Sequence, residues 1–262
     1  MYRYASAFSA LLLALAAVLT GAASARAAAV SYAALGDSYS SGLGAGAYES
    51  GAGACKRSSK AYPELWAAAH HPSSFVFAAC SGATTGDVTA GQLARLSSST
   101  GLVSISVGGD DAGFPDVMTT CVTSLGSTCL DRIAQARAYV RDTLPGRLDT
   151  VYSAIRAKAP NARVVVLGYP RLYQVPGDCL LGLGDTERRA LDSAADDLDT
   201  TVAARAAAHG FAFADVRHAF AGHELCSKAP WLRSVTLPPE ESYHPTQAGQ
   251  SGGYLPVFTA AA

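Results

Sequence analysis

The alternation of short apolar runs with longer segments of helical periodicity constrains the fold of this chain more than any other feature. Strands separated by helices pair in parallel, because each intervening helix carries the chain back across the sheet. The pattern therefore predicts an α/β fold whose central parallel sheet has helices on both faces. The five runs expected to form strands are residues 30–35, 74–79, 102–107, 162–168 and 210–216.

Two segments between these runs carry the clearest helical pattern. In residues 131–160 apolar side chains recur at helical spacing, and a break or kink is expected at Pro145, which lacks a backbone N–H. In residues 186–210 apolar side chains repeat at the same spacing before a glycine ends the helix. In a sheet of this kind, functional sites lie at the carboxyl ends of the strands.

Composition limits the partners. The chain has 262 residues, 49% of them hydrophobic and 16% charged, with a formal net charge of −1. Nucleic acids and anionic membranes attract clustered lysine and arginine, so this balance argues against both and favours a small or uncharged substrate. No repeat or proline-rich linker divides the chain, which indicates one domain. The segment SGLGAG at residues 41–46 misses the spacing of a dinucleotide-binding loop, and no cofactor is expected.

Residues 1–28 have the composition of a secretory signal. Arg3 is followed by an apolar segment over residues 8–19 and then by small residues at A-x-A spacing. The apolar segment is shorter than the ~20 residues of a membrane-spanning helix, so cleavage within residues 25–28 is favoured over an uncleaved anchor. We expect a secreted, extracellular domain over residues 29–262, without stable membrane insertion.

All six cysteines follow this signal, in a compartment where thiols oxidise, so three disulfides are expected. Spacing alone decides only that Cys121 and Cys129 close a short local loop, and the other pairings stay open. Neither a C-x-x-C motif nor histidines at ligand spacing occur, so no metal site is expected.

The segment GDS, residues 36–38, directly follows the first apolar run. Gly36 can adopt backbone angles that a side chain forbids, so a sharp turn there would present the Ser38 hydroxyl at the edge of the sheet. Such a hydroxyl is a candidate nucleophile. The alternative is that Asp37 or Ser38 only caps a helix.

A nucleophilic serine needs a base, and His244 is the candidate. It directly precedes Pro245, which favours an extended backbone and a loop position. An imidazole can take the Ser38 proton and return it to a leaving group, because its pKa lies near neutrality. Asp215, at the end of the fifth run, is another possible acid, for which a structural role is expected.

Two glycine-containing loops could stabilise an oxyanion. CSGATTGD, residues 80–87, follows the second run, and VGGDDAGF, residues 107–114, follows the third. In a parallel sheet these loops open beside Ser38, so the backbone N–H groups of Ser38 and Gly82 could converge on one small volume. Each loop could also be an ordinary turn.

These blocks together resemble the SGNH, or GDSL-type, hydrolases. Ser38 in GDS, Gly82 in CSGA, the GGxD segment after the third run and His244 in HP stand in the order of the four family blocks. The likeness extends through CKRS, AYPELWAA, GYPR, GHELC and GGYLP to the small secreted lipases and phospholipases of Streptomyces.

The resemblance implies a flavodoxin-like, three-layer α/β/α fold and a serine ester hydrolase that uses no metal. Ser38 would be the nucleophile, His244 the base, and the Ser38 and Gly82 amides part of the oxyanion hole. The resemblance also implies the disulfides Cys55–Cys80, Cys121–Cys129 and Cys179–Cys226.

Two positions depart from the family pattern. Asp110 stands where the family motif GGND has an asparagine that donates to the oxyanion, and an ionised carboxylate cannot donate. We therefore expect a hydrolase slower than its relatives. Glu241 stands where many relatives have an aspartate three residues before the histidine. The family branch suggests instead that the backbone carbonyl of Ser242 orients the ring, which predicts a dyad.

The substrate is expected to be a lipid or small ester, and the protein a monomer. An acyl chain could lie along an apolar segment near the end of the fourth run. An acyltransferase using the same acyl-enzyme and a catalytically impaired lipid-binding protein remain as alternatives. The apolar residues of this segment are Leu172, Tyr173, Val175, Leu180, Leu181 and Leu183.

Overall fold

The computed structural model of the protein describes residues 29–179 and 182–262. The signal segment expected over residues 1–28 lies outside the described residues. Five strands form one sheet in the order β2-β1-β3-β4-β5, and every pair of neighbours is parallel. The strands are β1 (Ser31–Gly36), β2 (Ser74–Phe77), β3 (Leu102–Ser106), β4 (Arg163–Leu167) and β5 (Ala212–Ala214).

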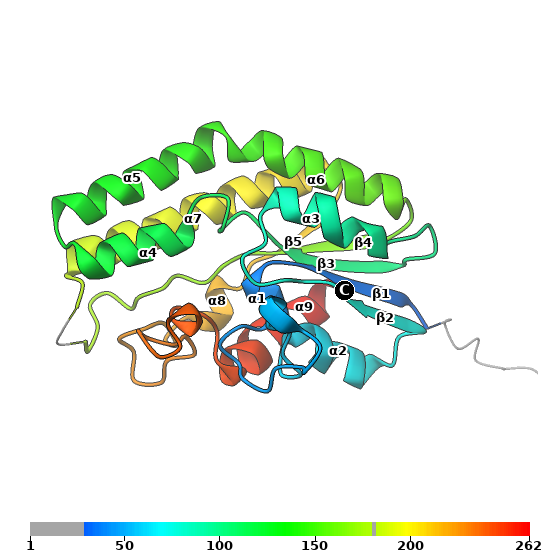
Figure 1. Cartoon of the computed structure of the whole chain (residues 1–262), viewed down its shortest axis with the longest axis horizontal. Helices are drawn as coiled ribbons and strands as arrows, with labels where there is room; N and C mark the ends of the chain where they lie inside the picture. Colours follow the sequence, from blue (N-terminus) through cyan, green and yellow to red (C-terminus); the bar gives the residue numbers. More distant parts are fainter. Residues whose placement is uncertain (1–28, 180–181) are drawn as a thin grey trace, which may run out of the picture.

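Helices cover both faces of the sheet and make three layers, as Figure 1 shows. The helices α3, α5, α6 and α7 lie on one side, and α2, α8 and α9 on the other. The predicted three-layer architecture with a five-stranded parallel sheet is confirmed. The α-helices are α1 (Ser38–Ser41), α2 (Tyr62–His70), α3 (Thr85–Gly91), α4 (Phe114–Thr123), α5 (Ser127–Asp142), α6 (Leu144–Lys158), α7 (Asp185–Ala208), α8 (Arg217–Phe220) and α9 (Leu255–Ala261).

The helical region around Pro145 forms two helices rather than one. α5 ends at Asp142 and α6 begins at Leu144, with the proline in the first turn of α6, where a missing N–H costs nothing. The structure thus agrees with the break expected there. α7 matches the second helical pattern to within two residues at each end. Shorter helical elements are η1 (Gly53–Cys55), η2 (Gln92–Arg95), η3 (Pro239–Glu241) and η4 (Gly249–Tyr254).

The central strands are apolar because both of their faces are covered. Residues 32–36 of β1 and all five residues of β3 are buried, whereas the outermost strand β2 is only partly buried. Their side chains join one hydrophobic core with the inner faces of the helices. Because β1 pairs with β2 on one side and β3 on the other, the loops after β1 and β3 open side by side at the point where the strand order reverses.

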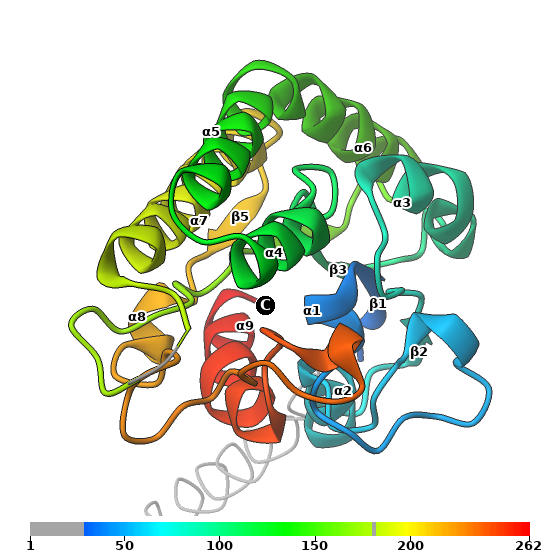
Figure 2. The same ribbon diagram turned by 60° about the vertical axis from the view of Figure 1, so that its left-hand side comes forward.

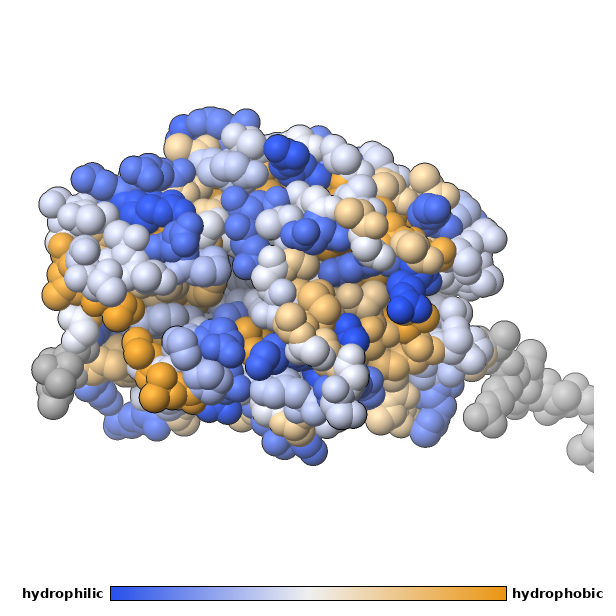
Figure 3. Space-filling view, in the orientation of Figure 1, coloured by the Kyte–Doolittle hydropathy of each residue, from blue (hydrophilic) through white to orange (hydrophobic). Residues whose placement is uncertain are grey.

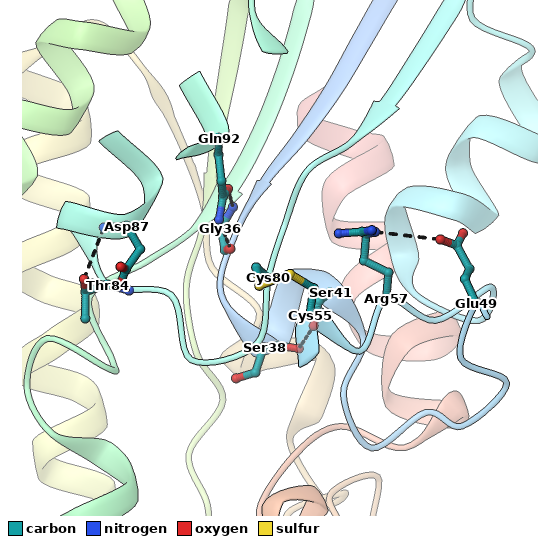
Figure 4. The surroundings of a disulfide bond; sticks show 10 residues. All are labelled: Gly36, Ser38, Ser41, Glu49, Cys55, Arg57, Cys80, Thr84, Asp87 and Gln92. Carbon is teal, nitrogen blue, oxygen red and sulfur yellow. Dashed lines mark hydrogen bonds and ion pairs between the residues drawn. A yellow bond between two sulfur atoms is a disulfide. The ribbon is translucent and has the colours of Figure 1, made fainter. Parts of the chain in front are cut away.

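Three disulfides join Cys55 to Cys80, Cys121 to Cys129, and Cys179 to Cys226. The first ties the loop after α1 to the loop after β2, close to Ser38 (Figure 4). Within the described ranges, every helix is too short or too polar to cross a bilayer.

Candidate active site

Ser38 lies at the carboxyl end of β1, where the chain turns directly into the one-turn helix α1. Gly36 makes this turn possible. Its φ is +118°, and a Cβ there would collide with the backbone of Ser106 on β3. The hydroxyl of Ser38 therefore stands above the sheet at the point where the strand order reverses.

The hydroxyl of Ser38 contacts the imidazole of His244, although the two residues are 206 positions apart in the chain. The distance from Oγ to Nε2 is 2.8 Å, and from Nδ1 to the carbonyl oxygen of Ser242 it is 2.9 Å. A carbonyl only accepts, so the neutral ring carries its proton on Nδ1. Nε2 is then free to accept from the Ser38 hydroxyl, as a general base requires.

The loop that carries His244 is curled back on itself. Tyr243 has φ +66°, a left-handed conformation uncommon for a residue with a side chain, and the carbonyl of Ser242 before it lies within hydrogen-bond distance of His244 Nδ1. The hydroxyl of Tyr39, next to Ser38, donates to the carbonyl of Tyr243 at 2.9 Å. One hydrogen bond thus connects α1 to the loop that carries His244.

The carboxylate of Glu241 contacts Tyr48 and Arg233 rather than the imidazole. It accepts from the hydroxyl of Tyr48 at 2.7 Å and lies 3.3 Å from the guanidinium of Arg233. The geometry therefore favours the backbone carbonyl of Ser242 over Glu241 as the group that orients His244.

His244 is buried, and burial lowers its pKa to about 4, although hydrogen bonds to nearby backbone carbonyls oppose this shift. The imidazole is therefore neutral at neutral and mildly acidic pH. Only the neutral ring can accept the hydroxyl proton.

Asp37, directly before Ser38, is held by a buried network. One carboxylate oxygen accepts from the backbone N–H of Tyr39 at 3.0 Å and the hydroxyl of Ser106 at 2.6 Å. The other accepts from the hydroxyl of Tyr169 at 2.5 Å. Burial raises the pKa of Asp37 to about 6, against these hydrogen bonds. Asp37 therefore caps α1, while Ser38 makes the contact to His244.

Two backbone N–H groups beside Ser38 could bind an anion. Within the described residues, neither the N–H of Ser38 nor that of Gly82 has a hydrogen-bond acceptor, and both residues line one cleft. Gly82 has φ +78°, which favours glycine. The N–H of Cys80, two residues earlier, binds the carbonyl of Gly36 at 2.9 Å, so the two loops are connected.

The amide of Gln92 supports this end of the sheet. It accepts from the N–H of Gly36 at 2.7 Å and donates to its carbonyl at 2.8 Å (Figure 4). Because Gln92 is buried and satisfies both backbone groups, the end of β1 is fixed before the turn to Ser38 begins.

Asp110 lines the same cleft as Ser38, Gly82 and His244. Burial, together with the neighbouring carboxylates of Asp37, Asp111 and Asp87, raises its pKa to about 7. Its neighbour Asp111 has a different role. The carboxylate of Asp111 accepts from both the N–H and the hydroxyl of Thr85, at 2.9 and 2.6 Å.

Two hollows meet at Ser38. The first, named here the histidine cleft, contains Ser38, Gly82 and His244 and lies between α4 and the loop around Val235. Figure 3 shows the surface hollowed between α4 and α1. The second, the helical cavity, is lined by apolar side chains of α4, α5 and α7. Ser38 and Asp110 line both.

The apolar segment expected to hold an acyl chain does not form the helical cavity. Of its described members only Leu172 lines that cavity, while Tyr173 and Leu183 are buried in the core. Leu180 and Leu181 lie outside the described residues. The described apolar residues of the segment belong to the hydrophobic core or pack against it.

The carboxylate of Asp215 forms an ion pair with Arg217 at 2.6 Å, which agrees with the structural role expected for it.

The chain matches the model of the GDSL-like lipase/acylhydrolase family over residues 34–251. It belongs to that family. It is 64% identical to Lipase 1 of Streptomyces coelicolor over 100% of this chain and 99% of the relative. It is 60% identical to the lipase of Streptomyces rimosus, over 99% and 98% of the two chains.

Two solved structures have the same fold at high sequence identity. The extracellular lipase of Streptomyces rimosus superposes with a TM-score of 0.88 at 62% identity, over 89% of this chain and 100% of that one. Phospholipase A1 of Streptomyces albidoflavus superposes with a TM-score of 0.88 at 58% identity, over 90% and 100%. This member of the GDSL-like family is therefore a carboxylic ester hydrolase.

Proposed function

We propose that this chain is an exported serine lipase or esterase in which Ser38 is the nucleophile and His244 the general base. The observation that carries the proposal is the 2.8 Å hydrogen bond between Ser38 Oγ and His244 Nε2, made at the mouth of two hollows. The carbonyl of Ser242 holds the proton on Nδ1, so a side-chain acid is not needed to select the tautomer.

The reaction proceeds through an acyl-enzyme. Ser38 Oγ attacks the ester carbonyl carbon while Nε2 of His244 takes the hydroxyl proton. The bond from the carbonyl carbon to the alcohol oxygen then breaks, and Nε2 returns the proton to that oxygen. Water repeats both steps and releases the fatty acid. The free N–H groups of Ser38 and Gly82 bind the oxyanion that forms in each half-reaction.

Asp110 completes this oxyanion site only when it is protonated. Its neutral carboxylic acid donates a hydrogen bond, whereas its carboxylate repels the negative oxygen. Because the pKa of Asp110 is raised to about 7, the donating form persists below neutrality. The loss of one such donor typically lowers turnover by about a hundred- to a thousandfold, so the enzyme is slow above neutral pH.

The substrate class is a lipid or small carboxylic ester. The apolar helical cavity beside Ser38 supports this assignment, as do relatives named lipase and phospholipase A1. Export is supported by the three disulfides and by the relative described as extracellular. The expected check on export is a mature N-terminus within residues 25–29 in protein recovered from culture medium.

The nucleophile is tested with p-nitrophenyl butyrate and an alkyl phosphonate. We expect Ser38→Ala to lower kcat/KM by about a thousandfold or more, and the phosphonate to attach to the peptide that contains Ser38. Ser41→Ala removes a hydroxyl from the same helix turn and should leave labelling intact. Ser38→Ala protein that retains activity within tenfold of the unmodified enzyme would refute the proposal.

The same assay separates hydrolysis from its alternatives. A burst of p-nitrophenol followed by steady release of butyric acid supports a hydrolase. Predominant transfer of butyrate to an added alcohol would instead support an acyltransferase. Tight lipid binding with no turnover in either the unmodified enzyme or Asp110→Asn would support a lipid-binding protein.

A further inference from the structure

The two hollows beside Ser38 differ in which catalytic group they contain. His244 lines the histidine cleft but not the helical cavity, whereas Ser38 lines both. Phe114, at the start of α4, also lines both and so stands where they meet. An ester attached at Ser38 therefore has two directions open to it, and only one of them passes the imidazole.

The chemistry of the proposed function assigns the two directions. His244 Nε2 must return its proton to the oxygen of the departing alcohol, so this oxygen lies on the histidine side. The water that later releases the acyl group must be activated by the same nitrogen, so it also approaches from that side. The acyl chain stays attached to Ser38 throughout, and it must leave the histidine side free for water.

We propose that the acyl chain of the substrate occupies the helical cavity and that the alcohol part occupies the histidine cleft. This inference rests on the proposed function. It adds where the acyl chain binds and which residues limit its length. The cavity is suited to a hydrocarbon, because its walls on α5 and α7 are stripes of apolar residues at helical spacing. These walls are Ile133, Ala136 and Val140 on α5, and Leu191, Ala195 and Leu198 on α7.

Small residues on both helices leave this space open. Ala136 on α5 and Ala194 and Ala195 on α7 line the cavity where larger side chains would fill it. The helices α5 and α7 run beside each other in both ribbon views (Figure 1; Figure 2). Arg137 lines the cavity and forms an ion pair with Asp197 on α7 at 2.7 Å. Both side chains are nearly half exposed, so this pair joins the two helices where the cavity reaches the surface.

Chain-length profiles test the proposal. Each methylene buried in an apolar site is expected to raise kcat/KM about fourfold, so the unmodified enzyme should prefer longer p-nitrophenyl esters until the cavity is full. Ala136→Phe and Ala195→Phe should lower kcat/KM for octanoate by about tenfold or more and leave acetate within about twofold. Ala134→Phe, on the exposed side of α5, is the matched control and should keep the original profile.

A covalent adduct tests the same point without relying on any variant. Phosphonylation of the unmodified enzyme with a hexylphosphonate p-nitrophenyl ester fixes a six-carbon chain to Ser38, and a crystal structure then shows where the chain lies. A chain between α5 and α7 supports the proposal. A chain in the histidine cleft, or an unchanged length profile in folded Ala136→Phe and Ala195→Phe, would overturn it. Labelling of Ser38 would support the proposed hydrolase function wherever the chain lies. If Ser38 is not labelled, the proposed function itself fails, and the position of the chain is no longer in question.

Discussion

The carbonyl oxygen of Ser242 accepts a hydrogen bond from Nδ1 of His244 at 2.9 Å, two residues along the same loop. The nearest acidic side chain in the sequence, Glu241, instead contacts Tyr48 and Arg233. The imidazole therefore hydrogen-bonds to a main-chain oxygen rather than to the nearby carboxylate.

Glu241→Gln should keep kcat/KM within about fivefold, because the glutamine can still accept from Tyr48 and the imidazole keeps its main-chain partner. His244→Ala should lower kcat/KM by about a thousandfold or more. Both are measured with p-nitrophenyl butyrate at pH 6. An equally large loss in the two variants would establish a side-chain triad and contradict the dyad.

Asp110→Asn should raise kcat/KM at pH 8 by about tenfold. The asparagine amide donates to the oxyanion at every pH, whereas the aspartate is largely ionised there and donates nothing. Asp110→Ala supplies neither a donor nor a charge and serves as the control. If Asp110→Asn is no faster than the unmodified enzyme, Asp110 is not part of the oxyanion site.

The pH profile of the unmodified enzyme should have two limbs. His244 must be neutral to act as a base, and its pKa is lowered to about 4, so activity rises as pH increases through 4. Asp110 must be protonated to donate, and its pKa is raised to about 7, so activity falls as pH increases through 7. Asp110→Asn should lose the upper limb and keep the lower one, which kcat/KM measured from about pH 3.5 to 9 will reveal. An upper limb that persists in the variant would belong to another group.

Gln92→Met should lower the free energy of unfolding by about 1–3 kcal/mol, because the buried N–H of Gly36 loses its acceptor. The carbonyl of Gly36 keeps a second donor, the N–H of Cys80, so only the N–H of Gly36 is left without a partner. Urea unfolding measures the change, and the exposed Gln135→Met is the control. A change no larger than that of the control would show that the amide is dispensable.

The disulfides should differ in their contribution to stability according to the loops they close. Cys179 and Cys226 are 47 positions apart, and Cys121 and Cys129 are 8 apart. Loop-closure entropy predicts about 4 kcal/mol for the longer loop and about 2.5 kcal/mol for the shorter one. Paired cysteine-to-alanine variants compared by urea unfolding check this order, and equal losses would argue against the entropic account.

The sheet was predictable because every strand is a short apolar run between segments that cannot continue it. Ser38 and His244 could be named from their motifs, and the alternation of strands and helices placed the first of them at the carboxyl end of β1. The helices α3, α4 and α9 were not predicted, since each is only 7 to 10 residues long and gives a short periodic pattern in the sequence.

The supporting contacts could not be read from the sequence. Tyr39 and Tyr243 are joined by a hydrogen bond across 204 positions, and a tyrosine in a sequence gives no indication of its partner. The helical cavity is equally hidden. Ala136 and Ala195 follow the same spacing whether a helix face packs tightly or leaves space, so the pattern that predicted the helices could not reveal the hollow between them.

The imidazole of His244 hydrogen-bonds to a main-chain carbonyl, so every amino acid that could stand at position 242 supplies the same oxygen. No amino-acid substitution there can delete it. What remains vulnerable is the curl of the loop, which depends on Tyr243 holding a left-handed backbone. In the proposed dyad the orientation of the imidazole therefore depends on a backbone torsion angle rather than on an acidic side chain.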